Sequence, residues 1–484
     1  MDLHIPHSSS LLLGALLEAA AGWEHPVWLV GGTVRDRACG RFSPDIDAVT
    51  AGDPAELARR VARLLDLPWF PLSHEFGAYR VVGRPAAAGH LDVAALRGDG
   101  IEADLALRDF TVNAMALPLL GGGEVVDPFG GRAHLAEERL VPVSAAIFAD
   151  DPLRLLRAVR FAHVLGLQID PDLRSLARAE AGRLPSAAAE RTLNEVVLTL
   201  EGGRSAAAVR LWDDLGLLGV LFPEVVALKG VGQSPFHQYD VFGHTLEAMD
   251  RLDELVAAPG RWFGLSWELL ATRLAEPVDG VMSRPVALRL GALLHDVAKP
   301  ETRAVGEEGR IIFWGHTEVG GPVAGSICGR LRCSAAATGL VRAAVERHLD
   351  IGFLQHARPV PPREAVRFLW RSAPWEPEVI LVSVADRLAT RGPRTEERHV
   401  DGHVAVARLL MDAWRGRVTE GVASPPVDGY GLMAELDLGP GPLLGEVLRE
   451  VRLAWEAGEL ADRDEALAHA AGYLAGRRTA GSGS

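Results

Sequence analysis

The sequence has few cysteines, no long apolar run and no secretory signal, and each absence excludes a class of protein. Its three cysteines, Cys39, Cys328 and Cys333, form neither an even framework nor a CxxC pair. This excludes a disulfide scaffold and favours a reducing, cytoplasmic compartment. The longest apolar stretch, residues 11–22, contains Glu18 and is too short to cross a bilayer. The N-terminus lacks the basic segment of a signal peptide, so we expect no membrane association.

The charge balance excludes a protein that coats nucleic acid through a general positive field. The 484 residues include 64 acidic and 50 basic side chains, which gives a net charge of −14. All the basic residues except Lys229 and Lys299 are arginines, whose guanidinium suits bidentate contacts with phosphates and bases. A local basic patch is therefore still compatible with the composition, and the length allows about three domains.

Hydrophobic periodicity divides the chain into a mixed part and a helical part. Short β-prone runs at 26–30, 79–82 and 124–126 alternate with helical stretches such as 54–65. Beyond Asp151 the apolar residues recur at three- and four-residue spacing, which is typical of amphipathic helices. The prediction is an α+β protein with a small mixed α/β domain followed by all-helical domains. Its predicted divisions are 1–143, 144–205, 206–400, 401–477 and a disordered tail at 478–484.

A glycine turn followed by paired aspartates is the first motif with chemical meaning. Gly31 and Gly32 end a β-prone run and precede a short helix that carries Arg35. Backbone N–H groups at such a turn can approach phosphate oxygens, and an arginine one turn later can add a charged contact. Asp45 and Asp47, two residues apart on an extended segment, point the same way and present the oxygen ligands that Mg²⁺ prefers. Each half alone is more often an ordinary turn or a solvated loop.

Together, the two halves resemble the opening of class II tRNA nucleotidyltransferases, the family of CCA-adding enzymes and bacterial poly(A) polymerases, in which VGGxVRD precedes DxD. Further segments follow in the family's order: RDFTVNA at 108–114, DPFGG at 127–131, DDPLR at 150–154 and Glu190-Arg191 with Glu195. Leu107 replaces the first arginine of the family's RRDFTxNA, and Asp150 replaces a glutamate of EDxxR.

The resemblance implies template-independent transfer, in which the tRNA 3′-hydroxyl attacks the α-phosphate of CTP or ATP and pyrophosphate leaves. It implies that Asp45 and Asp47 hold Mg²⁺, with Asp92 as a third catalytic carboxylate. Residues 1–143 are then a catalytic head, 144–205 a neck that binds base and RNA, and 401–477 a tRNA contact. The implied nucleotide-binding residues are Gly31, Gly32, Arg35, Arg108, Asp109, Asn113, Asp151, Arg154, Arg157 and Arg160.

Asp151 and Arg154 have a physical interpretation of their own. Spaced one helical turn apart, a carboxylate acceptor and a guanidinium donor can face one base edge together. Cytosine and adenine present an amino donor beside a ring-nitrogen acceptor, whereas uracil and guanine present the reverse. The pair can therefore select C and A without a nucleic-acid template. The alternative is an ordinary exposed ion pair.

A series of histidines and aspartates in the helical part resembles an HD phosphohydrolase domain over 206–400. Its metal-binding positions are filled by His244, His295, Asp296 and Asp386. Imidazole and carboxylate ligands suit a divalent transition metal such as Ni, Mn, Fe or Co, which can support hydrolysis of phosphate esters. His316 and His348 match further histidines near such sites. The alternative is a relic HD scaffold that only supports tRNA.

The segment between Asp92 and Arg108 bears on which nucleotide is added. CCA-adding relatives have a flexible loop here, rich in Arg, Asp and Gly, that switches the pocket from CTP to ATP, and A-adding members keep it. Residues 94–104 are too few to hold it, as in the CC-adding members, so we expect addition of CC only. The alternatives are full CCA addition, a metal phosphohydrolase with a nucleotide-binding N-terminal domain, and a poly(A) polymerase. The oligomeric state is left open.

Overall fold

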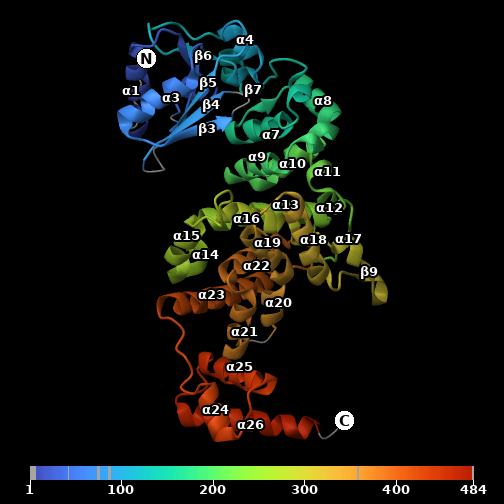
Figure 1. Cartoon of the computed structure of the whole chain (residues 1–484). Helices are drawn as coiled ribbons and strands as arrows, with labels where there is room; N and C mark the ends of the chain where they lie inside the picture. The colour runs from blue at the N-terminus through green and yellow to red at the C-terminus, as the bar shows by residue number, and fades with distance from the viewer. Residues whose placement is uncertain (1–6, 42, 74–76, 85–88, 357–358, 482–484) are drawn as a thin grey trace. The chain divides into compact units, whose positions relative to one another are not determined.

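The computed structural model describes residues 7–481 except 42, 74–76, 85–88 and 357–358 (Figure 1). A mixed sheet lies near the N-terminus, and helices form most of the remainder, which confirms the predicted α+β class. The chain forms two compact units, residues 1–195 with 211–220 and residues 196–210 with 221–484. These units do not test the four predicted domain limits, which stay predictions.

The first unit is built on a six-stranded sheet of order β3-β4-β5-β2-β1-β6. Its strands are β1 (Val27–Val30), β2 (Ile46–Thr50), β3 (Trp69–Ser73), β4 (Ala78–Val82), β5 (His90–Ala95) and β6 (Ala116–Pro118). The central pair β2 and β5 is parallel, and its register places Asp47 directly beside Asp92. The other pairs are antiparallel.

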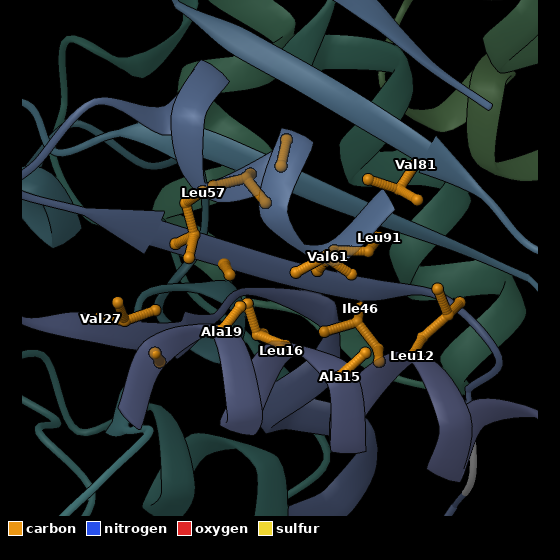
Figure 2. Packing of buried hydrophobic residues seen from close by; sticks show 14 of the residues in the cluster. Leu12, Ala15, Leu16, Ala19, Val27, Ile46, Leu57, Val61, Val81 and Leu91 are labelled. Atoms are coloured by element: carbon orange, nitrogen blue, oxygen red, sulfur yellow. The ribbon is translucent and has the colours of Figure 1, made fainter. Parts of the chain in front are cut away.

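One face of this sheet is apolar and is covered by two helices, α1 (His7–Ala21) and α3 (Pro54–Leu65) (Figure 2). Leu16 of α1 and Leu57 and Val61 of α3 are fully buried in the same cluster as Ile46 of β2. Because strand side chains alternate between faces, Asp47 must point away from this cluster. The covered face thus leaves the carboxylates on the opposite side of the sheet.

The prediction of a strand at 124–126 is wrong, because the structure has only a single bridge there. Val126 pairs with Ala116 in an isolated bridge, and no strand forms around it. Gly121 and Gly122 adopt positive φ just before it and Asp127-Pro128 follows, so the segment has no room for a ladder. The expected strands at 26–30 and 79–82 correspond to β1 and β4, and the expected helix at 54–65 is α3.

Helices and short strands complete the first unit, and the last of them, α9, extends into the second unit. They are α2 (Gly32–Ala38), α4 (Ile101–Ala106), α5 (Gly131–Ala136), β7 (Arg139–Leu140), α6 (Ile147–Asp150), α7 (Arg154–Leu165), β8 (Gln168–Ile169), α8 (Pro171–Glu180) and α9 (Ala189–Glu201). Parallel pairing of β7 with β8 ties the end of the predicted head to the predicted neck.

A buried network of charged side chains also joins these two parts. Asp109, only 4% exposed, accepts hydrogen bonds from the backbone N–H of Phe110 at 2.8 Å, from Asn113 Nδ2 at 3.1 Å and from Arg157 Nε at 2.7 Å. Burial opposes ionisation of Asp109, but Arg157 and the other donors still lower its pKa below the usual value. The network continues from Arg157 to Glu195 on α9, and it orders the arginines of α7.

The second unit is helical, with one small hairpin. Helices α10 (Ser205–Asp214) and α11 (Leu218–Leu221) are each divided between the two units. After them come α12 (Pro223–Val226), α13 (Val241–Ala257), α14 (Gly260–Phe263), α15 (Trp267–Ala275), α16 (Arg284–Leu294), α17 (Lys299–Thr302), β9 (Ala304–Val305), β10 (Ile311–Ile312), α18 (His316–Arg330), α19 (Ala335–Arg347), α20 (Asp350–Leu354), α21 (Pro362–Ser372), α22 (Glu376–Ala389) and α23 (Glu397–Thr419). All but one residue of α16 are buried, and α13, α19 and α22 pack against it.

The C-terminal helices α24 (Gly429–Leu436), α25 (Pro442–Glu456) and α26 (Arg463–Gly481) form a separate apolar cluster from Val427 to Leu474. Helix α23 lies before this cluster and packs on α22. Helix α26 extends to Gly481, so residues 478–481 of the predicted disordered tail are helical in the structure. Residues 482–484 lie outside the described part. Within the described residues, no helix is long and apolar enough to span a membrane.

The Asp109–Arg157 pair gives a stability test. We expect Asp109→Asn to lower the free energy of unfolding by about 3 kcal/mol, since it leaves the guanidinium of Arg157 without its carboxylate. Glu137→Gln, which breaks an exposed pair with Arg139, should cost less than about 1 kcal/mol. Urea unfolding followed by circular dichroism measures both values, and equal effects of the two changes would contradict this account.

Candidate active sites

The glycine turn between β1 and α2 lies against the carboxylate of Asp47. Gly31 has φ 62°, which favours glycine, and a Cβ placed there would lie 3.0 Å from Arg108 Nη1 and 3.5 Å from Asp47 Oδ2. The backbone N–H of Asp47 donates to Thr33 Oγ1 at 2.7 Å, which fixes β2 beside the turn. Backbone, carboxylate and guanidinium therefore meet at one point.

Three carboxylates gather on the polar face of the sheet around a histidine. His90 Nδ1 lies 2.8 Å from Asp45 Oδ1, and His90 Nε2 lies 3.6 Å from Asp92 Oδ2. The hydrogen bond to His90 lowers the pKa of Asp45, whereas burial and the charge of Asp92 raise the pKa of Asp47. Asp92 also accepts two hydrogen bonds from Arg80, both at 2.8 Å. The crowding of carboxylates beside Asp47 fits a site for a hard cation.

Arginines line the cleft beyond the carboxylates, and each is held by a partner. Arg35 Nη1 donates to Asn113 Oδ1 at 2.7 Å. Arg108 donates to Asp104 Oδ2 through Nε at 3.1 Å and Nη2 at 3.0 Å. Arg160 Nε donates to Glu195 Oε2 at 2.7 Å. Because these guanidiniums are fixed in advance, an anionic ligand need not order them.

The proposed base-selecting pair lies at the start of α7. Asp151 precedes the helix, so the two residues do not sit one turn apart within it as expected. Asp151 Oδ1 accepts from the N–H of Leu153 at 3.1 Å, and its Oδ2 accepts from Arg191 Nη2 at 2.9 Å. Arg154 Nη2 donates to the carbonyl of Leu107 at 2.7 Å. The two side chains are oriented by different partners and do not simply satisfy each other.

Apart from buried partners such as Asp104 and Glu195, the side chains just described line one cleft of about 620 Å³. Every sequence-predicted residue of the first unit lies along it, namely Gly31, Gly32, Arg35, Asp45, Asp47, Asp92, Arg108, Asp109, Asn113, Asp151, Arg154, Arg157 and Arg160. Asp109 is the most enclosed of its ionisable residues, and its hydrogen bonds serve to position Arg157. A cleft with carboxylates at one side and arginines at the other can hold a metal ion and a polyphosphate together.

Sequence reasoning assigned no role in this cleft to five charged residues that line it, namely Asp36, Arg80, His90, Arg97 and Arg191. Arg80 and His90 flank Asp92, the first across the strand pair and the second on the same face of β5. Strand alternation around Asp92 would have found His90, whereas the pairing of β4 with β5 brings Arg80 to Asp92. Arg97 lines the cleft from the segment after β5, and Arg191 was noted only as part of a supporting helix. Its contact with Asp151 spans 40 positions, so local pattern could not reveal it.

The second unit brings the predicted HD residues into one buried cluster. His244 lies on α13, His295 and Asp296 follow α16, and Asp386 lies on α22. His244 Nε2 is 2.9 Å from Asp386 Oδ1, and His295 Nε2 is 3.1 Å from Asp296 Oδ2. Burial opposes ionisation of Asp386, but its hydrogen bond with His244 still lowers its pKa far below the usual range.

Two more histidines join this cluster from α18 and the end of α19. The ligand atoms of Asp296, His316 and His348 all lie within 4.8 Å of one another. Burial and the charge of His295 lower the pKa of His348 to about 3, so its imidazole stays neutral. Asp296 Oδ1 is buried without a hydrogen-bond donor. A buried carboxylate oxygen without a hydrogen-bond donor, close to two imidazoles, fits a site for a divalent transition metal.

Three known sequence families match this chain. The Poly A polymerase head domain matches residues 74–141, and the HD domain matches residues 241–391. A family described as a probable RNA and SrmB-binding site of polymerase A matches residues 166–228. Their order along the chain is the order of the head, neck and HD segments expected from sequence.

Relatives that match over nearly the whole chain include tRNA nucleotidyltransferases. An A-adding tRNA nucleotidyltransferase of Deinococcus radiodurans is 35% identical over 91% of this chain and 94% of its own length. A CC-adding tRNA nucleotidyltransferase of Thermus thermophilus is 34% identical over 94% of this chain and 95% of its own length. A CCA-adding enzyme in complex with ATP shares the fold, with a TM-score of 0.63 at 21% identity over 96% of this chain and 95% of its own. The chain therefore belongs to the class II tRNA nucleotidyltransferases, the CCA-adding family, and carries an HD domain.

Proposed function

We propose that the cleft of the first unit transfers a nucleotide from CTP to the 3′ end of tRNA. The observation that carries this proposal is the meeting of Asp45, Asp47 and Asp92 with fixed arginines along one cleft. The named activities of the relatives supply the substrate class. Three unpaired cysteines support a reducing, cytoplasmic setting for this reaction.

In this proposal Asp45 and Asp47 hold Mg²⁺, which would favour loss of the 3′-hydroxyl proton and neutralise charge on the phosphates. The N–H groups of the glycine turn and the guanidinium of Arg108 bind triphosphate oxygens. Asp92 acts through its pair with Arg80 and through its negative charge beside Asp47, because Arg80 already contacts both of its oxygens. These residues place the α-phosphate for in-line attack, with pyrophosphate leaving.

Base selection rests on Asp151 and Arg154. Arg191 holds the Asp151 carboxylate, and the Leu107 carbonyl holds Arg154. A carboxylate acceptor faces the amino group of cytosine, and a guanidinium donor faces its ring nitrogen and carbonyl. Uracil presents an N–H donor and a carbonyl acceptor in the reverse order, so it leaves both side chains unpaired.

We propose further that addition stops after CC. The connection between β5 and α4 consists of residues 96–100 and is tied down. The backbone N–H of Leu96 donates to the Thr50 carbonyl at 2.9 Å, and the Arg97 guanidinium donates to Asp104 Oδ1 at 2.8 Å. Asp104, fully buried, also holds Arg108. A short, pinned connection supports a pocket that keeps one size, whereas a switch to the larger adenine needs a mobile element.

Because the relatives include both A-adding and CC-adding enzymes, three other products must be distinguished from CC by experiment. Full CCA addition requires a moving element other than this connection. Addition of A alone requires that the pocket fit adenine from the start. A poly(A) polymerase would extend RNA with repeated A. Each alternative gives a different product on defined tRNA ends.

A second proposed function is hydrolysis of phosphate esters in the HD cluster of the second unit. The completeness of the set His244, His295, Asp296 and Asp386 supports it, because a scaffold that only supports tRNA has no need of buried, converging ligands. Terminal phosphates and 2′,3′-cyclic phosphates of RNA are the substrates that suit a tRNA-end enzyme. A protein in which only this site is active, with a nucleotide-binding head, is the competing interpretation.

The nucleotide prediction is tested on three tRNA transcripts, ending at the discriminator nucleotide, after one C and after two C. With Mg²⁺ and a single labelled nucleotide, we expect CMP to be added to the first two and AMP to none. Asp45→Ala should abolish incorporation, since it removes a metal ligand. Efficient AMP addition after two C would contradict the CC-only proposal and leave nucleotide transfer intact.

The selectivity prediction concerns Asp151. Loss of a buried charged hydrogen bond typically costs about 2–5 kcal/mol, so Asp151→Ala should lower the preference for CTP over UTP by roughly tenfold or more. Asp172→Ala, an exposed carboxylate of α8, is the matched control and should keep the preference. The measurement is kcat/KM for each nucleotide. Unchanged discrimination in the Asp151 variant would contradict selection by side chains.

The HD prediction separates the two chemistries. A variant with His295→Ala and Asp296→Ala should lose phosphatase and 2′,3′-cyclic phosphodiesterase activity while nucleotide addition continues. Asp45→Ala should show the opposite pattern, because the ligand sets lie in different units. Loss of both activities in either variant, with the circular dichroism spectrum unchanged, would refute independent sites. No hydrolysis by the unaltered chain with any of Ni²⁺, Mn²⁺, Fe²⁺ or Co²⁺ would support the relic-scaffold alternative.

A further inference from the structure

The turn that joins helices α18 and α19 has the hydrogen bonds of a complete Schellman motif. The backbone N–H of Arg332 donates to the carbonyl of Gly329 at 3.1 Å, and the N–H of Cys333 donates to the carbonyl of Cys328 at 2.9 Å. Arg332 has φ 62°, the left-handed conformation that this motif requires. In such a turn the third residue from the helix end commonly contacts the residue after the left-handed position. Here those two residues are both cysteines.

The two thiols of this turn contact each other through a hydrogen bond. The Cys333 thiol donates to Cys328 Sγ, which also accepts from the hydroxyl of Thr338 on α19. The turn itself is held in place, because the Ser334 hydroxyl donates to Asp279 Oδ2 at 2.5 Å. Backbone hydrogen bonds and side-chain contact thus agree in placing the two sulfurs side by side, where a disulfide needs little movement of the backbone.

The two cysteines differ in exposure and in the ease with which they lose a proton. Cys328 is 1% exposed, whereas Cys333 is partly accessible to solvent. The hydrogen bond from Cys333 lowers the pKa of Cys328, and the same hydrogen bond together with burial raises the pKa of Cys333. The pair therefore releases its first proton more easily than its second, which leaves an enclosed thiolate beside an accessible thiol.

We propose that Cys328 and Cys333 are a redox-active dithiol that a hydroperoxide converts into a disulfide. In the first step Cys333 Sγ attacks a peroxide oxygen, the O–O bond breaks and the proton of Cys333 passes to the Cys328 thiolate. Cys333 becomes a sulfenic acid, and hydroxide leaves. In the second step Cys328 Sγ attacks Cys333 Sγ, the S–S bond forms and the S–O bond breaks. The proton of Cys328 leaves with the hydroxyl group as water, and the two sulfurs have given two electrons to the peroxide.

This chemistry suits a protein of a reducing compartment and does not depend on either proposed activity. Disulfides in such compartments are usually transient and serve catalysis or redox sensing. A second thiol that captures a sulfenic acid also prevents its further, irreversible oxidation. Because the bridge joins the end of α18 to the residue before the start of α19, oxidation would restrain the turn between two helices that pack together.

The test uses the full chain with Cys39→Ser, in which Cys328 and Cys333 are the remaining cysteines. The reduced protein is treated with hydrogen peroxide, and catalase then removes the excess. N-ethylmaleimide blocks the thiols that remain, so that none can exchange with a disulfide during digestion.

Tryptic mapping identifies the bridge, because the turn contains two cleavage sites. Cleavage after Arg330 and Arg332 places the two cysteines in separate peptides, 311–330 and 333–342. Mass spectrometry should find these peptides joined, with a mass lower by two hydrogen atoms than their sum. Dithiothreitol should separate them again.

Single-thiol variants in the same background distinguish the two cysteines. In Cys328→Ala, Cys333 has no partner, so it should form a sulfenic acid that dimedone labels and then a sulfinic acid. In Cys333→Ala, the enclosed Cys328 should stay a thiol under the same treatment. Sulfinic acid at Cys333 in the two-thiol protein, with Cys328 still free to react with maleimide after unfolding, would overturn the inference.

The unaltered chain supplies an internal comparison through Cys39. This cysteine is exposed, and no other cysteine lies in its unit. We expect Cys328 and Cys333 to be bridged at the peroxide concentration that fully oxidises Cys39. Two free thiols under that condition, or a bridge between chains that appears as a dimer on a non-reducing gel, would refute the proposal. The peptide map of the two-thiol protein decides the question even where circular dichroism shows that a single-thiol variant has not folded.

Discussion

The enclosed carboxylate of Asp109 connects the proposed nucleotide cleft to helices α7 and α9 of the predicted neck. Through Asn113 it is linked to Arg35 beside the glycine turn, and through Arg157 it is linked to Glu195 and Arg160. The chain of contacts runs from α2 to α9 within one unit. Because a buried charge is stable only while every partner stays in place, this network fixes several cleft arginines in a single geometry. The proposed phosphate-binding side of the site depends on it.

The opposite side of the cleft depends on the parallel pairing of β2 with β5. That register sets Asp47 beside Asp92 and leaves their charges close together on a half-buried surface. Nearby Arg80 and His90 offset part of this repulsion. Folding places these carboxylates close enough to repel each other. A bound metal ion would relieve this repulsion, which favours cation binding at the site.

The two candidate sites use opposite ligand chemistry, and each suits its proposed metal. The first offers carboxylates and backbone N–H groups, which match a hard ion and a triphosphate. The second offers four imidazoles around shared carboxylates, which match softer transition metals. Placing them in separate units allows each to load its own ion, and it makes the two proposed chemistries separable by mutation.

The sequence alone determined the α+β class, the motifs of the nucleotide cleft and the residues of the HD series. It could do so because strand alternation, glycine turns and ligand residue types are local properties, and because the motifs match a known family in order. Even so, the boundaries of weak elements failed at 124–126 and 478–481, where short-range propensity and neighbouring turns compete.

Only the tertiary structure decided which charges meet. The pairing of Arg191 with Asp151, of Arg80 with Asp92 and of Arg97 with Asp104 comes from the packing of separate elements. The same holds for His316 and His348, which reach Asp296 from helices that sequence spacing does not relate. The physical reason is the distance along the sequence over which each effect acts. Backbone propensity acts over a few residues, whereas the position of a charge relative to its partner is fixed by the fold as a whole.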